Sequence, residues 1–334
     1  MTIEFFKKKS ITKYNKNLFV NNEQINKKYN SKKKILIYQS GDFHTEIAGF
    51  IIYYYNNYTI DIYHPFNKSS NNCFSYYEKI FKIKMNYINV TNEDEYEYIF
   101  MLTSREIKTS YIKNFNKYIL FKHVNEDNFD KFLNISLTPI VSANSYILPI
   151  YNNPNQNKRH NIICIIGNMS CNKIRDIDGT IKLIGLLKSF HVYIFTRKIK
   201  DEYKSELSKF DNCSIYINMS TETMIDKIRR SKFILTADTK YYSENGHSTG
   251  VLTGMIPLAL NNDVPLILSK NLNKIYNIKG VIEYDELHNI SNQINNMDNC
   301  VYNSILKCFV SYKNDVLVDN KRELEKKLNL SISI

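Results

Sequence analysis

The chain has 334 residues, enough for two domains of ordinary size, and 43% of them are hydrophobic. We expect no membrane span, because no stretch approaches the roughly 18 apolar residues that one requires, and no signal peptide, because the lysine-bearing N-terminus lacks an apolar core. The net charge of +12 would suit nucleic acid, an anionic membrane surface or phosphate-bearing ligands, although a solvated lysine-rich surface is the simpler explanation.

The six cysteines are scattered, with no CxxC pair and no Cys/His cluster at zinc spacing. Cys164 and Cys213 fall in apolar runs, where a free cysteine behaves as a small hydrophobe. The pattern therefore predicts a reducing, cytoplasmic compartment and no metal site. We also expect no resident cofactor.

Residues 1–34 are polar and basic, and we expect an N-terminal arm there. In residues 35–150, short apolar runs alternate with segments of helical spacing. The first strand is predicted at 35–38, the first helix at 47–55, and further strands at 58–63, 83–90, 98–102 and 118–121. This alternation predicts βαβ units around a mostly parallel sheet.

Residues 149–160 are polar and hold two of the six prolines, so we predict a domain boundary there. In residues 161–300 the alternation starts again and predicts a second α/β domain. Its strands are expected at 161–166, 191–195, 214–217, 233–236, 265–269 and 280–283, and its helices include 178–190, 201–210 and 221–230. Residues 301–334 have apolar positions at helical spacing, and we expect a helical segment that crosses back to the first domain.

Residues 233–269 contain the polar loop around which the second domain is organised. Three of the nine glycines, Gly246, Gly250 and Gly254, fall in this window, which runs from a strand-like apolar run through a polar loop to a run with the character of a buried helix. Free N–H groups at a helix start favour an anion. An ordinary strand-to-helix turn has the same pattern, so both interpretations stay open.

The order of these elements resembles the nucleotide-sugar-binding domain of GT-B glycosyltransferases over residues 160–285. Residues 214–238 are similar to the strand, short helix and strand that lead to the donor loop of that family, and residues 250–269 to its signature of small residue, helix and Pro-containing strand. The resemblance implies two Rossmann-like domains with mostly parallel sheets that face each other across a cleft. The second domain would hold the nucleotide-sugar donor, and the first would hold the acceptor.

The sequence departs from the family pattern at two places. The glutamate pair of many retaining members falls on Gly250 and Leu258, and Thr196-Arg197 replaces a Gly-x-Gly after a strand. A Rossmann dehydrogenase is disfavoured, because no Gly-x-Gly-x-x-Gly follows Ile37 and a single glycine follows Ile166.

The resemblance implies a site for the donor diphosphate, which requires cations or N–H groups as charge develops on it. The candidate donor-binding residues follow predicted strands or lie in the polar loop: Gly167, Asn168, Lys173, Arg175, Arg197, Glu244, His247, Ser248, Thr249 and Gly250. Glu244 would accept hydrogen bonds from ribose or sugar hydroxyls. Ser248 and Thr249 also suit a helix N-cap, Arg197 also suits an ordinary surface, and residues 167–175 also suit a solvated loop.

Asp42 and His44 follow the first predicted strand, where the resemblance places the general base of an inverting enzyme. His44 would take the proton of the acceptor hydroxyl, because the pKa of histidine lies near neutrality. Asp42 would orient His44 or act itself. An ordinary loop histidine remains the alternative.

We therefore predict a glycosyltransferase that moves a sugar from a nucleotide-sugar to a glycan, protein or other hydroxyl acceptor. We expect it to be inverting, and metal-independent because no Asp-x-Asp pair stands at a predicted strand end. The alternative is a catalytically lost GT-B-like module that binds sugar nucleotide, glycan or nucleic acid. The missing glutamate pair favours this module, whereas the polar cluster at 244–250 favours the enzyme. Nucleic acid is motivated only by the positive charge.

Overall fold

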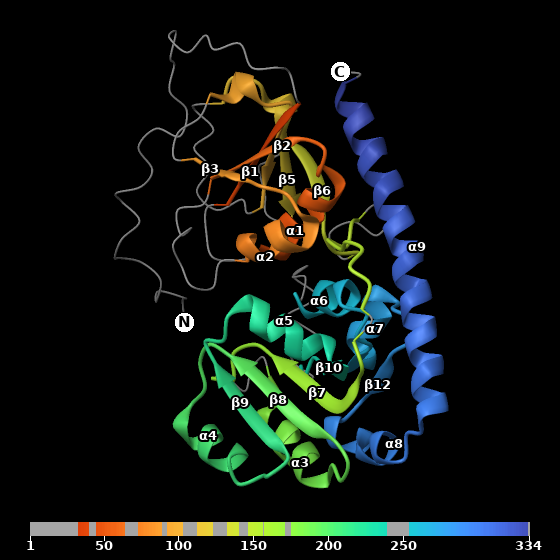
Figure 1. Cartoon of the computed structure of the whole chain (residues 1–334). Helices are drawn as coiled ribbons and strands as arrows, with labels where there is room; N and C mark the ends of the chain where they lie inside the picture. The colour runs from red at the N-terminus through yellow and green to blue at the C-terminus, as the bar shows by residue number, and fades with distance from the viewer. Residues whose placement is uncertain are drawn as a thin grey trace, which may run out of the picture.

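The computed structural model describes residues 33–39, 45–63, 73–88, 92–102, 112–122, 132–139, 146–155, 157–170, 175–238 and 254–332. These residues form two parallel sheets, one from each half of the chain, together with a long C-terminal helix that runs past both (Figure 1). The predicted fold class of two Rossmann-like domains with parallel sheets is confirmed.

The first sheet has the strand order β3-β2-β1-β4-β5-β6, and every neighbouring pair is parallel. Its strands are β1 (Lys34–Tyr38), β2 (Thr59–Tyr63), β3 (Asn86–Tyr87), β4 (Tyr98–Met101), β5 (Tyr118–Lys122) and β6 (Leu133–Ser136). The helices of this half are α1 (Thr45–Tyr54), α2 (Phe74–Phe81) and the 3-10 turns η2 (Glu93–Glu95) and η4 (Phe115–Lys117). The central strands β1 and β4 are almost wholly buried, as the continuous apolar runs of parallel strands predict.

The second sheet has the order β12-β11-β10-β7-β8-β9, again with all pairs parallel. Its strands are β7 (His160–Ile166), β8 (His191–Thr196), β9 (Cys213–Ile217), β10 (Ser231–Leu235), β11 (Leu266–Ser269) and β12 (Ile282–Tyr284). Its helices are α3 (Ile177–Leu186), α4 (Asp201–Leu207), α5 (Thr221–Arg229), α6 (Met255–Asn261), α7 (Lys270–Tyr276), η7 (Leu287–Ile290) and α8 (Ser291–Asn295). Both sheets therefore have the Rossmann order 3-2-1-4-5-6, which puts a ligand crevice at the carboxyl ends of the central strands.

Several elements are shorter than the sequence predicts. The helix expected to reach residue 190 ends at Leu186, because the side-chain amide of Asn212 donates to the carbonyls of Ile184 and Leu187, each at 3.1 Å. These bonds stabilise the extended exit of the chain. The strand expected at 83–90 is reduced to Asn86–Tyr87 at the edge of the first sheet.

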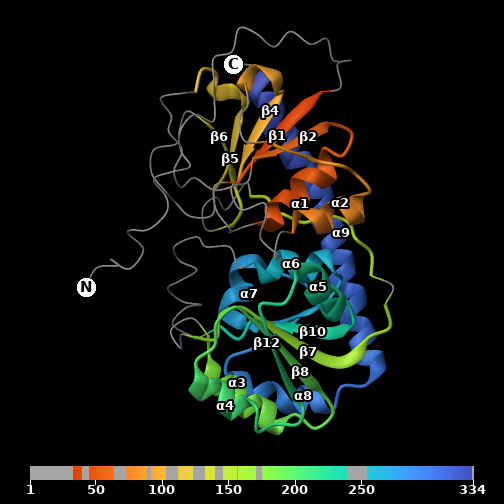
Figure 2. The same cartoon turned by 60° about the vertical axis from the view of Figure 1, so that its left-hand side comes forward.

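The helix α9 (Asn299–Ile332) has 34 residues and contacts both halves. Figures 1 and 2 show it along one side of the two sheets. The hydroxyl of Tyr54 on α1 donates to the carbonyl of Leu317 at 3.0 Å, and the amide of Asn320 donates to the carbonyl of Leu148 at 2.5 Å. The backbone of the second half also packs closely against α9 at Gly280. A Cβ at this position would lie 2.3 Å from the backbone nitrogen of Phe309. In the described part of the chain, no helix combines the length and hydropathy that a membrane span requires.

Asp263 connects α9 to the chain between the two sheets. One carboxylate oxygen accepts from Lys313 Nζ on α9 at 2.6 Å, and the other accepts from the backbone nitrogen of Asn155 at 2.9 Å. The Lys313 side chain is 2% exposed and that of Asp263 9%. Arg159 donates to the Asp263 carbonyl at 2.5 Å, and burial lowers the pKa of its guanidinium. The prediction that residues 149–160 act as a hinge stays a prediction, since one arrangement of the sheets is described.

The Lys313–Asp263 pair gives a first test. We expect Lys313→Met to lower the free energy of unfolding by about 3–5 kcal/mol, because it leaves a buried carboxylate without its cation. Adding Asp263→Asn removes that charge, keeps an acceptor for Asn155, and suits the left-handed backbone of residue 263, whose φ is 53°. Urea unfolding should therefore show the double variant as more stable than Lys313→Met. Equal stability of the two variants would contradict the ion-pair explanation.

Candidate functional site

A cavity of about 430 Å³ lies at the carboxyl ends of β7, β8 and β9. Its lining also comes from α5 and α6 of the second half and from α2 and the 151–155 segment associated with the first. Figures 1 and 2 both show α5 and α6 on the side of the second sheet that faces α1 and α2. The cavity is therefore placed where the Rossmann strand order predicts a ligand, and both halves contribute to its walls.

The backbone turns sharply at three strand exits of the second sheet. Gly167 follows β7 with a φ of 129°, Asn218 follows β9 with 54°, and Ala237 lies two residues after β10 with 50°. Left-handed conformations cost a residue with a Cβ about 1–2 kcal/mol. Glycine avoids that cost, and asparagine is among the residues that tolerate it best. Gly167 and Asn218 both line the cavity, so two of these turns shape its wall.

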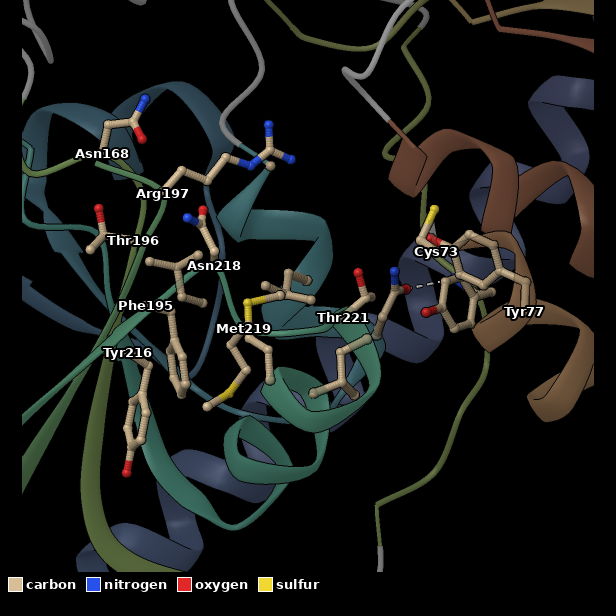
Figure 3. Close-up of a pocket in the computed structure, with 18 residues that line it drawn as sticks. Cys73, Tyr77, Asn168, Phe195, Thr196, Arg197, Tyr216, Asn218, Met219 and Thr221 are labelled. Atoms are coloured by element: carbon tan, nitrogen blue, oxygen red, sulfur yellow. Dashed lines mark hydrogen bonds between the residues drawn. The ribbon is translucent and has the colours of Figure 1, made fainter. Parts of the chain in front are cut away.

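The polar end of the cavity carries Asn168, Arg197 and Asn218. Figure 3 shows these three side chains at one end, with Cys73 and Tyr77 at the other. Among the described residues that line the cavity, Arg197 alone carries a full charge, and both Arg197 and Asn168 are exposed. The Thr196 hydroxyl donates to the carbonyl of Lys198 at 2.7 Å and so stabilises the turn that carries Arg197. A lone guanidinium beside two amides favours an anionic ligand group.

Most of the remaining lining is apolar or aromatic. The rings of Phe195 and Tyr216 are stacked, with centroids 5.3 Å apart and an interplanar angle of 17°. Met219, Met224 and Leu258 extend this surface. Tyr77 and Tyr151 form the wall nearest the first sheet, with an edge contact between rings 5.9 Å apart. The cavity therefore suits a ligand with an anionic part at one end and flat or apolar parts elsewhere.

A hydrogen bond inside the cavity lining joins the two halves. The backbone nitrogen of Tyr151 donates to Oδ1 of Asn261, the last residue of α6, at 2.8 Å. This bond is buried, so it is protected from competition with water. It fixes the wall formed by Tyr151 relative to α6.

Arg175 does not line the cavity. Its guanidinium donates to the carbonyl of Thr236 at 2.5 Å and to the Asp238 carboxylate, and it lies near the carbonyl of Ile166 at 3.4 Å. The Arg175 side chain is 12% exposed and that of Asp238 is fully buried. Gly167 packs against this guanidinium, because a Cβ there would lie 2.9 Å from Nη2. Arg175 thus joins the exits of the neighbouring strands β7 and β10.

Of the predicted donor-binding residues, the structure brings Gly167, Asn168 and Arg197 together in one cavity and places Arg175 behind it. The other predicted residues lie outside the described part of the chain: Asp42, His44, Lys173, Glu244, His247, Ser248, Thr249 and Gly250. Their roles stay predictions. Within the described residues, no group of three or more His, Cys, Asp or Glu side chains is arranged to hold a metal ion.

Four further residues line the cavity and were not predicted from the sequence: Tyr77, Tyr216, Asn218 and Met219. The sequence could have indicated Asn218, because an asparagine directly after a strand-like run is typical of a left-handed turn at a sheet edge. Tyr77 had no such signal, since it reaches the cavity from a helix of the other half. Its position depends on the contact between the halves, which no local pattern encodes.

Comparison with solved structures extends the description of the fold. The chain is similar to the Anabaena protein HepE, whose structure contains UDP and glucose, with a TM-score of 0.59 and 10% identity over 88% of this chain and 99% of that one. It is also similar to AviGT4, a glycosyltransferase involved in avilamycin A biosynthesis, with a TM-score of 0.57 and 9% identity over 90% of this chain and 99% of that one.

A UDP-GlcNAc 2-epimerase from Neisseria meningitidis, bound to UDP-GlcNAc, matches with a TM-score of 0.50 and 9% identity over 87% of this chain and 100% of that one. No family model and no curated protein matches the sequence. The chain therefore has the GT-B fold, in a sequence far diverged from these structures. The resemblance found from the sequence is confirmed at the level of the fold.

The different burial of the two arginines gives a second test. We expect Arg175→Met to lower the free energy of unfolding by about 3–5 kcal/mol, because the buried Asp238 carboxylate loses its cationic partner. The matched variant Arg197→Ala removes an exposed side chain and should change stability by about 0.5 kcal/mol or less. Urea unfolding of both proteins measures the difference. If Arg175→Met were as stable as Arg197→Ala, the assignment of Arg175 to the protein interior would be wrong.

Proposed function

We propose that the chain transfers a sugar from a UDP-sugar to the hydroxyl group of an acceptor. The observation that carries the proposal is the cavity end formed by Asn168, Arg197 and Asn218, which offers a cation and amides at the ligand edge of the second Rossmann-like sheet. The UDP bound to HepE and the UDP-GlcNAc bound to the epimerase support a nucleotide-sugar as the ligand of this fold.

In the proposed reaction, the acceptor oxygen attacks the anomeric carbon as the bond from that carbon to the diphosphate oxygen breaks. The diphosphate leaves with the electron pair, and a general base takes the proton of the hydroxyl. The Arg197 guanidinium would stabilise the negative charge that develops on the diphosphate. Metal independence is part of the proposal, supported by this guanidinium and by the lack of an Asp-x-Asp pair at a strand end of the sequence.

The proposal also includes inversion of configuration at the anomeric carbon. Many retaining GT-B enzymes carry a glutamate pair whose second member aligns with Leu258, and Leu258 contributes an apolar side chain to the cavity lining. The base would come from His44 or Asp42, in the segment between β1 and α1. Two alternative functions are each supported by a separate observation. The missing glutamate pair favours a binding module without turnover, and the likeness to the Neisseria enzyme favours epimerisation.

Donor binding gives a third test. We expect one nucleotide class to stabilise the wild type in a thermal-shift panel of UDP-, GDP-, ADP- and CMP-sugars, with UDP-sugars giving the shift. Arg197→Ala should weaken UDP binding by about 1–3 kcal/mol in calorimetry, because it removes a charged hydrogen-bond donor to phosphate. Arg230→Ala is the control, since Arg230 is an exposed arginine of the same domain that pairs with Asp226. Equal losses in both variants, or none, would count against the site.

The general base gives a fourth test. His44→Ala and Asp42→Asn should leave UDP affinity unchanged, because the base acts on the acceptor, and the variant that removes the base should lower turnover by about 10²–10⁴. A histidine base would give an activity limb near pH 6.5, rising with pH as the imidazole loses its proton, and an unperturbed aspartate would give one near pH 4. UDP release measures transfer or hydrolysis.

Full turnover in the double variant would place the base elsewhere or indicate a retaining mechanism. A wild type that binds donor without turnover would establish a binding module. A changed sugar configuration with the nucleotide still attached would indicate an epimerase.

A further inference from the structure

The helices α2 and α5 face each other at the rim of the cavity and are connected by an ion pair. Lys79 of α2 contacts the carboxylate of Glu222 in the first turn of α5. The two residues belong to opposite halves of the molecule and are 143 positions apart in the sequence. Their side chains are 69% and 57% exposed, so the pair lies in solvent and not in the interior.

Both partners stand next to residues that form the cavity wall. Tyr77 lies two positions before Lys79 on α2, and Thr221 directly precedes Glu222 at the start of α5. Figure 3 shows Thr221 between the polar end of the cavity and Tyr77. A change in the separation of Lys79 and Glu222 would therefore change the separation of the two walls.

The other end of α5 is connected to α2 through the segment between the halves. Arg229 donates to the carbonyl of Pro154 at 2.7 Å and of Asn153 at 3.4 Å. The side-chain amide of Asn153 in turn donates to the hydroxyl of Tyr76 on α2 at 3.3 Å. The C-terminal end of α5 is thus fixed to the connecting segment. A small rotation of α5 about this end would therefore widen the cavity most at the other end, which carries Glu222.

We propose that Lys79 and Glu222 are a positioning pair that sets the width of the cavity between α2 and α5. They touch no ligand and act through the walls that carry Tyr77 and Thr221. An exposed ion pair contributes up to about 1 kcal/mol, which corresponds to a shift of up to about fivefold in the ratio of closed to open molecules. Because the pair is exposed, salt screens it, so the cavity of the free protein widens as ionic strength rises.

Charge reversal and charge exchange test the proposal. The proteins to compare are the wild type, Lys79→Glu, Glu222→Lys and the exchanged variant with both changes. Small-angle X-ray scattering of the ligand-free proteins at low salt should give a larger radius of gyration for each single variant, because like charges then face each other across the rim. The exchanged variant should return to the wild-type value. At about 1 M salt the Debye length falls to about 3 Å, and the four proteins should become alike.

A matched control uses the exposed pair Lys209–Glu206, whose partners both lie in the second half, with side chains 62% and 50% exposed. Reversing either of these charges changes the net charge by the same amount as reversing Lys79 or Glu222. The Lys209–Glu206 pair, however, does not connect the two walls of the cavity. The radius of gyration should therefore stay at the wild-type value in Lys209→Glu and in Glu206→Lys. A change equal to that of the Lys79 and Glu222 variants would attribute the effect to net charge and overturn the proposal.

Binding of UDP gives the second measurement, and this one rests on the proposed function. Calorimetry at low salt should show UDP affinity lowered about two- to fivefold in each single reversal and restored in the exchanged variant. If single reversal leaves both scattering and affinity unchanged, or if exchange restores neither, the pair does not set the width. If no protein binds UDP while the scattering pattern holds, the proposed ligand is wrong and the positioning pair stands.

Discussion

One buried carboxylate fixes the second half, the connecting segment and the long helix α9 relative to one another. Asp263 occupies the turn between α6 and β11, and its two oxygens accept from Lys313 of α9 and from Asn155 of the connecting segment. A buried charge held in this way cannot lose a partner without a large penalty, so the three segments keep one relative position. Since α6 supplies Leu258 and Asn261 to the cavity, the same carboxylate also fixes one of its walls.

Two arginines of the second half have different roles because their surroundings differ. Arg175 and Arg197 both lie in segments that follow strands of the second sheet. Arg175 is enclosed by carbonyls and by Asp238, so its donors are used by the protein. Arg197 is exposed at the end of the cavity, and the turn beneath it is stabilised by the Thr196 hydroxyl. Burial therefore decides which guanidinium remains available to a ligand.

The features that could be predicted from the sequence are those that depend on local pattern. Apolar runs located the central strands of both sheets, and their alternation with helical segments led to the parallel arrangement, because each βαβ unit buries both faces of its strands. The sequence also selected Gly167, Asn168 and Arg197, which follow strands whose carboxyl ends meet at one edge. It could not place Tyr77, which depends on contact between the halves. Arg175 was predicted to bind the donor, and no local pattern shows that Asp238 lies beside its guanidinium.

The cavity combines two kinds of wall with different physical consequences. Its charged end belongs to the second half alone, whereas the wall nearest the first half is aromatic, with Tyr77 and Tyr151. Electrostatic attraction would therefore draw an anionic ligand to Arg197 whatever the distance between the halves, and that distance would decide how well the apolar wall excludes water. Capture and closure would then depend on different residues. With Lys79 and Glu222 as the proposed positioning pair, ionic strength would act on the separation of the walls as well as on the attraction of the ligand.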